Sequence, residues 1–354
     1  MPKLTLLSFT LAPVIAIAFT VCDWLLLDDI IPNRGPGTSA YDWLKTAVAA
    51  GFATALVASI LLDGRRARAA SPLGEPRLGL VGLTFASSAA FVLLFLVNPT
   101  GFNWLGSEDN IVEYLSAILG IVGAVFFAGV ALAAHHLPDG SPNRRLTLTF
   151  AALCAVVLFL LGMEEISWGQ RLFGFGTPES FAANRQGEVN LHNFFTTPVH
   201  TIYRLGSWAV LILLPFMVTF GPRLRLFDAF HNFLPPPWIA AMSAPVACFN
   251  YNAWPFLPTQ VVVFSSLLMM AAFWQHARQG RQERAWLFGA ATLLIIVAQA
   301  AFLIGGDRFI RPWDVTEYQE FFMAFGLAAV GWAAWARVRE RSQQAEVRLA
   351  TKGR

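Results

Sequence analysis

The chain has 354 residues, of which 56% are hydrophobic and only 13% are charged, and its formal net charge is +3. This composition excludes an ordinary soluble domain, because apolar runs of about 20 residues recur along the chain, as in proteins with several membrane-spanning helices. The small net charge, with arginines in short loops, indicates membrane topology rather than nucleic-acid binding.

The apolar runs predict an all-α fold, a polytopic transmembrane helical bundle of about ten spans, because backbone groups in lipid must be paired within helices. The first run could pass for a signal peptide, but it is long and lacks a small-residue cleavage site, so we expect a retained span. The seventh run contains Pro245, Asn250, Asn252 and Pro255, which predicts a broken or re-entrant helix. The expected spans cover residues 4–27, 41–62, 78–98, 110–134, 146–163, 203–221, 238–254, 258–275, 285–305 and 316–337.

Basic residues follow every second span, so the positive-inside rule places these five regions and both termini in the cytoplasm. We therefore expect a multi-pass protein of the bacterial cytoplasmic (inner) membrane. One integral membrane domain would cover residues 1–340, with a long extracytoplasmic loop at 164–201 and a basic cytoplasmic tail at 341–354. The basic residues are Arg65, Arg66, Arg68, Arg77, Arg144, Arg145, Arg223, Arg225, Arg278, Arg281, Arg284, Arg337, Arg339, Arg341, Lys352 and Arg354.

Acidic side chains gather on the other, extracytoplasmic side under this topology. The long aromatic-rich loop also lies there, and Thr177, Pro178 and Glu179 resemble a helix start, which predicts a short interfacial helix. The titratable residues expected on this side are Asp42, Asp109, Glu113, Glu164, Glu165, His192, Asp307, Asp314, Glu317 and Glu320.

Glu164 and Glu165 are the strongest sign of a site, because they end the apolar run 146–163. A helix C-terminus favours cations, and ionisable groups near the membrane edge are expensive and often functional. If the helix continued, Glu164, Trp168 and Arg171 would share one face. Two interpretations without a functional site stay open: the helix ends in water, or Glu164 forms an ion pair with Arg171.

Helix capping explains some of the other acidic residues. Asp42, Glu113 and Glu317 each stand three residues after a capping residue, as in a capping box. Glu320 lies one turn deeper, beyond the reach of capping. Asp314, Glu317 and Glu320 span an arc of about 120° and are able to face one cavity.

His192 shares the long loop with the paired glutamates and could fold back onto them, although a lone loop histidine is more often a surface residue. The cofactor is unknown. A divalent metal ion is one option, because mixed nitrogen and oxygen ligation by Glu164, Glu165 and His192 suits zinc, manganese or iron. Without a metal, the same groups could act as general acid and base. No serine-hydrolase, phosphate-loop or dinucleotide motif is present.

Residues 162–171 read GMEEISWGQR, and residues 187–193 read GEVNLHN. This pattern resembles one in uncharacterised bacterial multi-span membrane proteins. The resemblance covers about 30 residues firmly and the rest in outline. It supports a site at these residues and implies no activity.

The first hypothesis is an enzyme, a hydrolase or transferase acting on a lipid or lipid-linked substrate. The catalytic residues would be Glu164, Glu165, His192 and Glu320, and the substrate-binding residues would be Gln170, Arg171, Asn193, Trp168, Asp314 and Glu317. The alternatives are a proton- or cation-coupled transporter or flippase, and a non-catalytic membrane subunit. Expected partners are membrane lipids and no nucleic acid, and the sequence leaves the oligomeric state open.

Overall fold

The computed structural model describes residues 3–27, 36–64, 77–107, 109–137, 143–181, 184, 187–191, 194, 196–252 and 254–352. Nine helices within these ranges are long and apolar enough to cross a membrane, which confirms the expected all-α polytopic bundle. They are α1 (Lys3–Leu27), α2 (Ala40–Gly64), α3 (Leu78–Val97), α5 (Ile111–His135), α6 (Arg144–Glu165), the continuous run of α8 (Thr196–Trp208), η4 (Ala209–Leu213) and α9 (Leu214–Phe220), then α13 (Leu257–Gln279), α14 (Trp286–Ile304) and α15 (Val315–Lys352).

Short helices connect or interrupt these spans. They are α4 (Pro99–Leu105), η1 (Ser167–Gly169), α7 (Gln170–Phe173), η2 (Glu179–Phe181), α10 (Arg225–Ala229), α11 (Pro237–Met242), α12 (Pro245–Cys248), η5 (Gly306–Arg308) and η6 (Pro312–Asp314). The interfacial helix expected near residue 177 is the single 3₁₀ turn η2, and its three residues are not buried.

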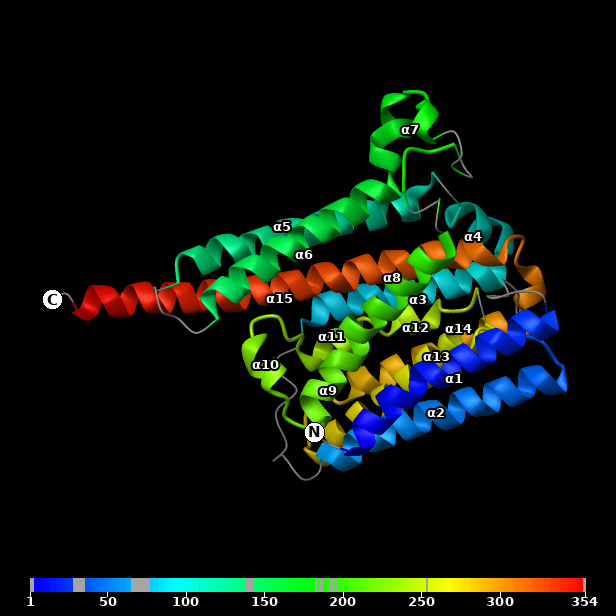
Figure 1. Cartoon of the computed structure of the whole chain (residues 1–354), viewed down its shortest axis with the longest axis horizontal. Coiled ribbons are helices and arrows are strands. Elements are labelled where there is room, and N and C mark those ends of the chain that lie inside the picture. Colours follow the sequence, from blue (N-terminus) through cyan, green and yellow to red (C-terminus); the bar gives the residue numbers. More distant parts are fainter. Residues whose placement is uncertain are drawn as a thin grey trace.

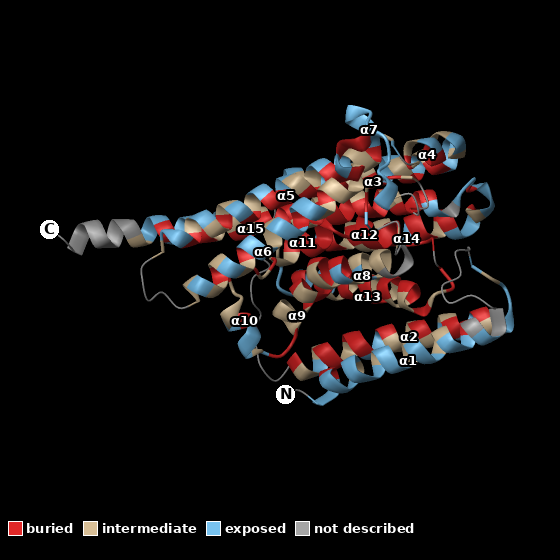
Figure 2. Cartoon of the chain, turned by 45° about the horizontal axis from the view of Figure 1, so that its top comes forward, coloured by how far each residue is buried: buried red, intermediate tan, exposed pale blue. Residues whose placement is uncertain are grey.

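The long helices run roughly parallel or antiparallel to one another (Figure 1). Helix α5 packs between α6 and α15, whereas α1 packs on α2 and α2 packs on α13. The segments α11 and α12 lie in the buried centre of the bundle (Figure 2). Every long helix therefore extends between the same two ends of the molecule.

One end of the bundle, which we call the basic end, collects the ends of α2, α9 and α13. The rings of Phe220 and His276 lie 5.2 Å apart between centroids. Gly64 lies so close to the Phe220 carbonyl group that an added Cβ would collide with it. The arginines that follow these helices in sequence include Arg223 and Arg278.

The first and last helices reach the basic end too. Thr5, at the start of α1, donates a hydrogen bond of 2.7 Å from Oγ1 to Asp63 near the end of α2. Arg337 of α15 donates to the carbonyl oxygen of Asn232, between α10 and α11, over 2.7 Å. The start of α1 and the end of α15 therefore lie on the same side, as expected for the two termini. The segment expected as a tail continues α15 as helix to Lys352.

The opposite end, which we call the acidic end, joins segments that are distant in sequence. Arg308 donates to the carbonyl oxygen of Leu96 at the end of α3 over 3.1 Å. The Tyr318 hydroxyl group donates to the carbonyl oxygen of Phe102 in α4 over 2.6 Å. The end of α6 lies here too, because Arg171, just beyond it, pairs with Asp109 before α5 at 3.5 Å. Most of the acidic side chains singled out in the sequence belong to this end.

The seventh expected span is a broken helix, as its prolines and asparagines predict. It consists of α11 and α12, and the chain crosses there from α10 at the basic end to the start of α13 at the acidic end. Irregular backbone at membrane depth is stable only when protein covers it. Two buried glutamines supply partners: the Gln299 amide donates to the carbonyl oxygens of Ala247 and Cys248, and the Gln319 amide donates to that of Val246.

Two glycines bring α6 against α5 and so fix where α6 ends. An added Cβ on Gly162 would lie 2.8 Å from the Ala117 carbonyl oxygen, and one on Gly120 would lie 3.2 Å from the Cα of Gly162. Small residues allow membrane helices to approach closely. Glu165 follows Gly162 by three residues, so this contact determines the position of its carboxylate.

Candidate functional site

Helix α6 ends at Glu165. Glu164, Trp168 and Arg171 therefore do not share a helix face, as they would on a longer helix. The next residues turn sharply, with φ of 46° at Ser167, 56° at Trp168 and 79° at Gly169. Positive φ is costly for residues other than glycine and persists only where surrounding contacts hold it. The turn sends the chain away from the helix axis into a structured loop.

Glu164 holds this loop in place. Its Oε1 accepts a hydrogen bond of 2.8 Å from the Trp168 indole nitrogen, and its Oε2 accepts one of 2.6 Å from the backbone nitrogen of Leu191. The ion pair considered between Glu164 and Arg171 is replaced by others, because Arg171 pairs with Asp109 at 3.5 Å and with Glu188 at 3.3 Å. Glu164 and Trp168 thus stabilise the loop that follows α6.

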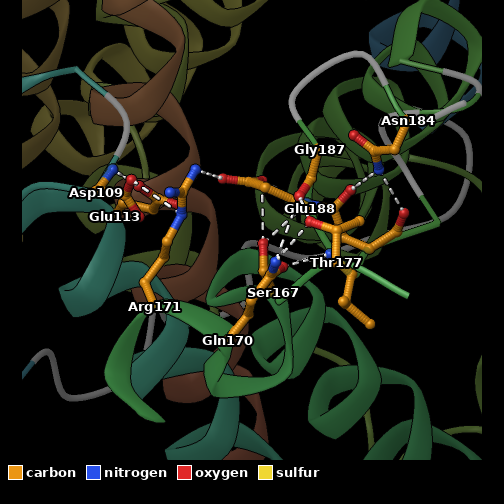
Figure 3. A network of polar contacts seen from close by, with 11 residues as sticks. Asp109, Glu113, Ser167, Gln170, Arg171, Thr177, Asn184, Gly187 and Glu188 are labelled. Atoms are coloured by element: carbon orange, nitrogen blue, oxygen red, sulfur yellow. Dashed lines mark hydrogen bonds and ion pairs between the residues drawn. The ribbon is translucent and has the colours of Figure 1, made fainter. Parts of the chain in front are cut away.

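Glu188 is the centre of the loop network (Figure 3). Its carboxylate is nearly buried and accepts hydrogen bonds from Ser167 Oγ at 3.0 Å and from Asn190 Nδ2 at 2.8 Å, besides the contact with Arg171. Gln170 completes the network: its amide nitrogen donates to Thr177, and its amide oxygen accepts from Val189 N at 2.7 Å. These bonds tie residues 167–171 to residues 187–190.

Glu188→Ala is expected to open this loop. Hydrogen bonds to a charged group contribute about 1.5–3 kcal/mol each, and several donors would lose their acceptor. Cleavage by a protease that samples the open state should accelerate at least about tenfold within residues 164–191, since each 1.4 kcal/mol is a factor of ten. Limited proteolysis of the purified protein measures this. Glu179→Ala, at an exposed residue of the same loop, is the matched control. Equal cleavage rates in both variants would contradict the assigned role.

Three carboxylates meet at the acidic end of the bundle. Oxygen atoms of Glu165 at the end of α6 and of Glu317 and Glu320 on α15 all lie within 4.8 Å of one another. Glu320 is only 4% exposed, and the other two are half-buried. We call these three residues the carboxylate cluster. Glu317 and Glu320 share a face of α15 because they are three residues apart.

Helix α8 adds nitrogen groups to the carboxylate cluster. His200 Nδ1 lies 3.3 Å from Glu320 Oε1. Arg204 stands one turn further along α8, within electrostatic range of Glu317 and Glu320, and its Nε is shielded from solvent without a hydrogen-bond partner among the described residues. Tyr203 lies near Glu165 and Glu320. Positive charge is needed here, because two like charges 4 Å apart repel by about 4 kcal/mol at an effective dielectric constant of about 20.

The donor set of the carboxylate cluster fits a divalent cation. Carboxylate oxygens bind such ions at about 2.0–2.6 Å, so oxygens within 4.8 Å of one another are able to share one ion. Carboxylate oxygens suit magnesium, calcium or manganese, and His200 contacts one of these carboxylates, that of Glu320. Of the metal ligands expected from the sequence, only Glu165 belongs to this set, since Glu164 bonds to the loop and His192 lies outside the described residues.

The remaining site candidates have other surroundings. Asp314 is buried and accepts a hydrogen bond of 3.2 Å from Arg311. Gln170 and Arg171 belong to the loop network, and Asn193 lies outside the described residues.

Hydrogen bonds to the backbone account for two of the acidic residues at helix starts. Asp42 forms the expected capping box, since its backbone nitrogen donates to Ser39 Oγ over 3.1 Å and its carboxylate accepts from Ser39 N. The capping box expected between Asn110 and Glu113 does not form, because the Asn110 side chain makes no capping hydrogen bond; Glu113 instead accepts one from the backbone nitrogen of Asp109, before the start of α5. These roles are structural and leave the carboxylate cluster as the chemical centre of the acidic end.

Sequence reasoning missed the contribution of α8. His200, Tyr203 and Arg204 are spaced i, i+3 and i+4, so they share a helix face. Arg204 also opens an apolar run, and an arginine at the end of a membrane span is itself a signal of a paired or functional group. That signal would have pointed to this face of the sixth span.

The chain matches no protein family, and no curated protein or solved structure is similar to it. The fold alone defines the class: a multi-pass helical membrane protein. The geometry adds a half-buried cluster of three glutamates and a histidine at one end of the bundle.

Proposed function

We propose that this protein is an enzyme of the bacterial cytoplasmic membrane, a hydrolase or transferase that acts on a lipid or lipid-linked substrate at the extracytoplasmic surface. The observation that carries the proposal is the convergence of Glu165, Glu317 and Glu320 with His200, from three helices that are distant in sequence. Ionisable groups at membrane depth are expensive to keep, and they gather at functional sites.

The arrangement supports general acid–base chemistry. One carboxylate of the cluster takes a proton from water or from an acceptor hydroxyl group. The oxygen of that water or hydroxyl group then attacks the ester or phosphoester group of the substrate. The departing oxygen receives a proton from a second group, for which His200 against Glu320 is placed. Arg204, with a shielded Nε, offers a donor to the negative charge that develops on the substrate.

The position of the carboxylate cluster favours an enzyme over a coupled transporter. Coupling sites of transporters tend to lie near the bilayer midplane. The carboxylate cluster instead lies at the last residue of α6 and in the first two turns of α15. The α6 side chains that precede it, from Leu146 to Met163, include no ionisable group other than Cys154.

Mass spectrometry of lipid extracts tests the proposal. Cells that overproduce the wild-type chain should lose one lipid class and gain its product relative to cells that overproduce a Glu165→Gln/Glu320→Gln variant at equal protein level. Identical lipid profiles would contradict the proposal. Elemental analysis of both purified proteins tests whether the carboxylate cluster holds a metal ion. A stoichiometric transition metal that is lost in the variant indicates metal-assisted chemistry. Its absence from both proteins indicates catalysis by carboxylate and histidine.

A further inference from the structure

An apolar groove lies in the membrane-spanning part of the bundle, between helices that also carry the carboxylate cluster. It has a volume of about 650 Å³ and lies between α6 on one side and the α8–α9 run on the other, with α5 and α15 behind it. Its lining is almost entirely hydrocarbon and aromatic. Cys154, Tyr203 and Ser207 bring the few polar atoms of its side chains. A space of this kind excludes polar ligands and accepts apolar ones.

The two walls of the groove have nearly the same length. On α6 the lining runs from Phe150 to Leu161, and on the α8–α9 run it extends from Ile202 to Leu214. The α6 wall covers eleven residue steps, about 16 Å at about 1.5 Å per residue, and the α8–α9 wall covers twelve, about 18 Å. This is about half of the roughly 30 Å hydrocarbon thickness of a bilayer, so the groove matches a chain from one leaflet.

One end of the groove lies near the carboxylate cluster, and Tyr203 connects the two. Leu161 lies one helical turn before Glu165, and Tyr203 both lines the groove and lies in the field of Glu165 and Glu320. A ligand with an apolar chain and a polar group fits this combination. Its chain would lie along α6 and α8 while its polar group reached Glu320.

Aromatic rings line the other end of the groove. The ring of Phe150 packs edge to face on Phe230 and on Phe233, with centroids 5.0 Å and 4.8 Å apart. All three rings line the groove. These rings form the floor of the groove, and each such aromatic pair contributes about 0.5–1.5 kcal/mol beyond the area that it buries. The floor sets a limit to the length of chain that the groove holds.

Gly206 leaves space in the groove near the end of α8. Its position is exposed, and an added Cβ would meet no atom within 4 Å, so close packing against protein does not explain the glycine. Glycine inside a helix costs about 0.5–1 kcal/mol relative to alanine. Beside it, Leu153, Val157 and Ile202 are 45–73% exposed, and they form a sideways opening toward the surrounding lipid.

We propose that this groove binds one hydrocarbon chain of the lipid substrate and presents the polar group of that lipid to the carboxylate cluster. That the bound lipid is the substrate rests on the proposed function. The matching length, the apolar lining, the sideways opening and the polar mouth all fit a single acyl or isoprenoid chain that enters from the outer leaflet.

Photolabelling with a lipid probe tests the groove without any need for turnover. The full chain is reconstituted in vesicles of phosphatidylethanolamine and phosphatidylglycerol that contain a phosphatidylglycerol with a diazirine at the end of one acyl chain. After illumination, mass spectrometry compares labelling of the groove floor, residues 226–234, with labelling of the lipid-facing helix α1. We expect the floor to be labelled in the wild type, and Gly206→Leu to lower that labelling at least about tenfold, the effect of a 1.4 kcal/mol steric penalty.

Gly51→Leu is the matched control, because Gly51 is an exposed helical glycine of α2 whose added Cβ also meets no atom within 4 Å. It should label the floor as the wild type does, and Gly206→Ala, a smaller obstruction, should give an intermediate value. Glu320→Gln should label normally, which separates chain binding from the reaction proposed at the carboxylate cluster. An unlabelled floor in the wild type, or equal labelling in Gly206→Leu and Gly51→Leu, would overturn the groove assignment.

Discussion

Lys45→Met is expected to lower the free energy of unfolding by about 3–5 kcal/mol, because it leaves a buried charge without its partner. The ammonium group of Lys45 lies 2.7 Å from Asp23 Oδ1, and the two side chains are 0% and 1% exposed. The Tyr41 hydroxyl group donates to the same oxygen over 2.9 Å. This contact joins α1 to α2 within the bundle.

A double-mutant cycle separates the ion pair from its surroundings. In reversible unfolding in mixed micelles, Lys45→Met combined with Asp23→Asn should recover most of the stability that Lys45→Met loses, because no uncompensated charge remains. Lys3→Met, at an exposed lysine of α1, is the matched control and should change little. If Lys45→Met unfolded like the wild type, the pair would contribute nothing and the packing assigned to α1 and α2 would need revision.

Glu320→Gln is expected to slow substrate turnover by about 10²–10⁴-fold, the range that a positioned acid or base contributes. The amide keeps the shape of the carboxylate, so the fold should persist while the negative charge beside His200 is lost. Turnover is measured with the lipid identified by the comparison of extracts, presented to the purified protein in vesicles.

The control for this variant is Glu179→Gln, which removes the same charge from an exposed residue of the loop. Its turnover should equal that of the wild type, and the thermal unfolding of Glu320→Gln should stay close to that of the wild type. A fully active Glu320→Gln protein would exclude Glu320 from the reaction.

The helical fold could be predicted from the sequence because hydrophobic runs report membrane spans directly. The broken seventh span was also visible, since Pro245 and Pro255 cannot continue a helix. The partners of its free carbonyl groups were not visible. Gln299 and Gln319 lie on other helices, and only the packed bundle brings them to Ala247, Cys248 and Val246.

The candidate site was predictable in part. The spacing of Glu317 and Glu320 and the position of Glu165 indicated a common face and a membrane edge, and the structure brings these three together. The separation of Glu164 from Glu165 was not predictable, because it depends on the positive φ angles that turn the chain at Ser167 and Trp168.

The groove was not predictable from the sequence at all. An apolar stretch such as 146–163 has the same sequence pattern whether its side chains face lipid, protein or an enclosed space. Gly206 gives no signal by itself either, since glycine is frequent in membrane helices. The distinction comes only from the tertiary structure, in which an added Cβ at Gly206 meets no atom.

The most direct test of the central claim compares turnover in two variants at neighbouring residues, Glu165→Gln and Glu164→Gln. Glu165 belongs to the carboxylate cluster, whereas the two oxygens of Glu164 accept hydrogen bonds from Trp168 and Leu191. We expect Glu165→Gln to lose at least about 100-fold in turnover, and Glu164→Gln, which keeps one acceptor oxygen, to stay within about tenfold of the wild type. Equal losses in the two variants, or full activity of Glu165→Gln, would contradict a reaction centre built on the convergence of Glu165, Glu317 and Glu320.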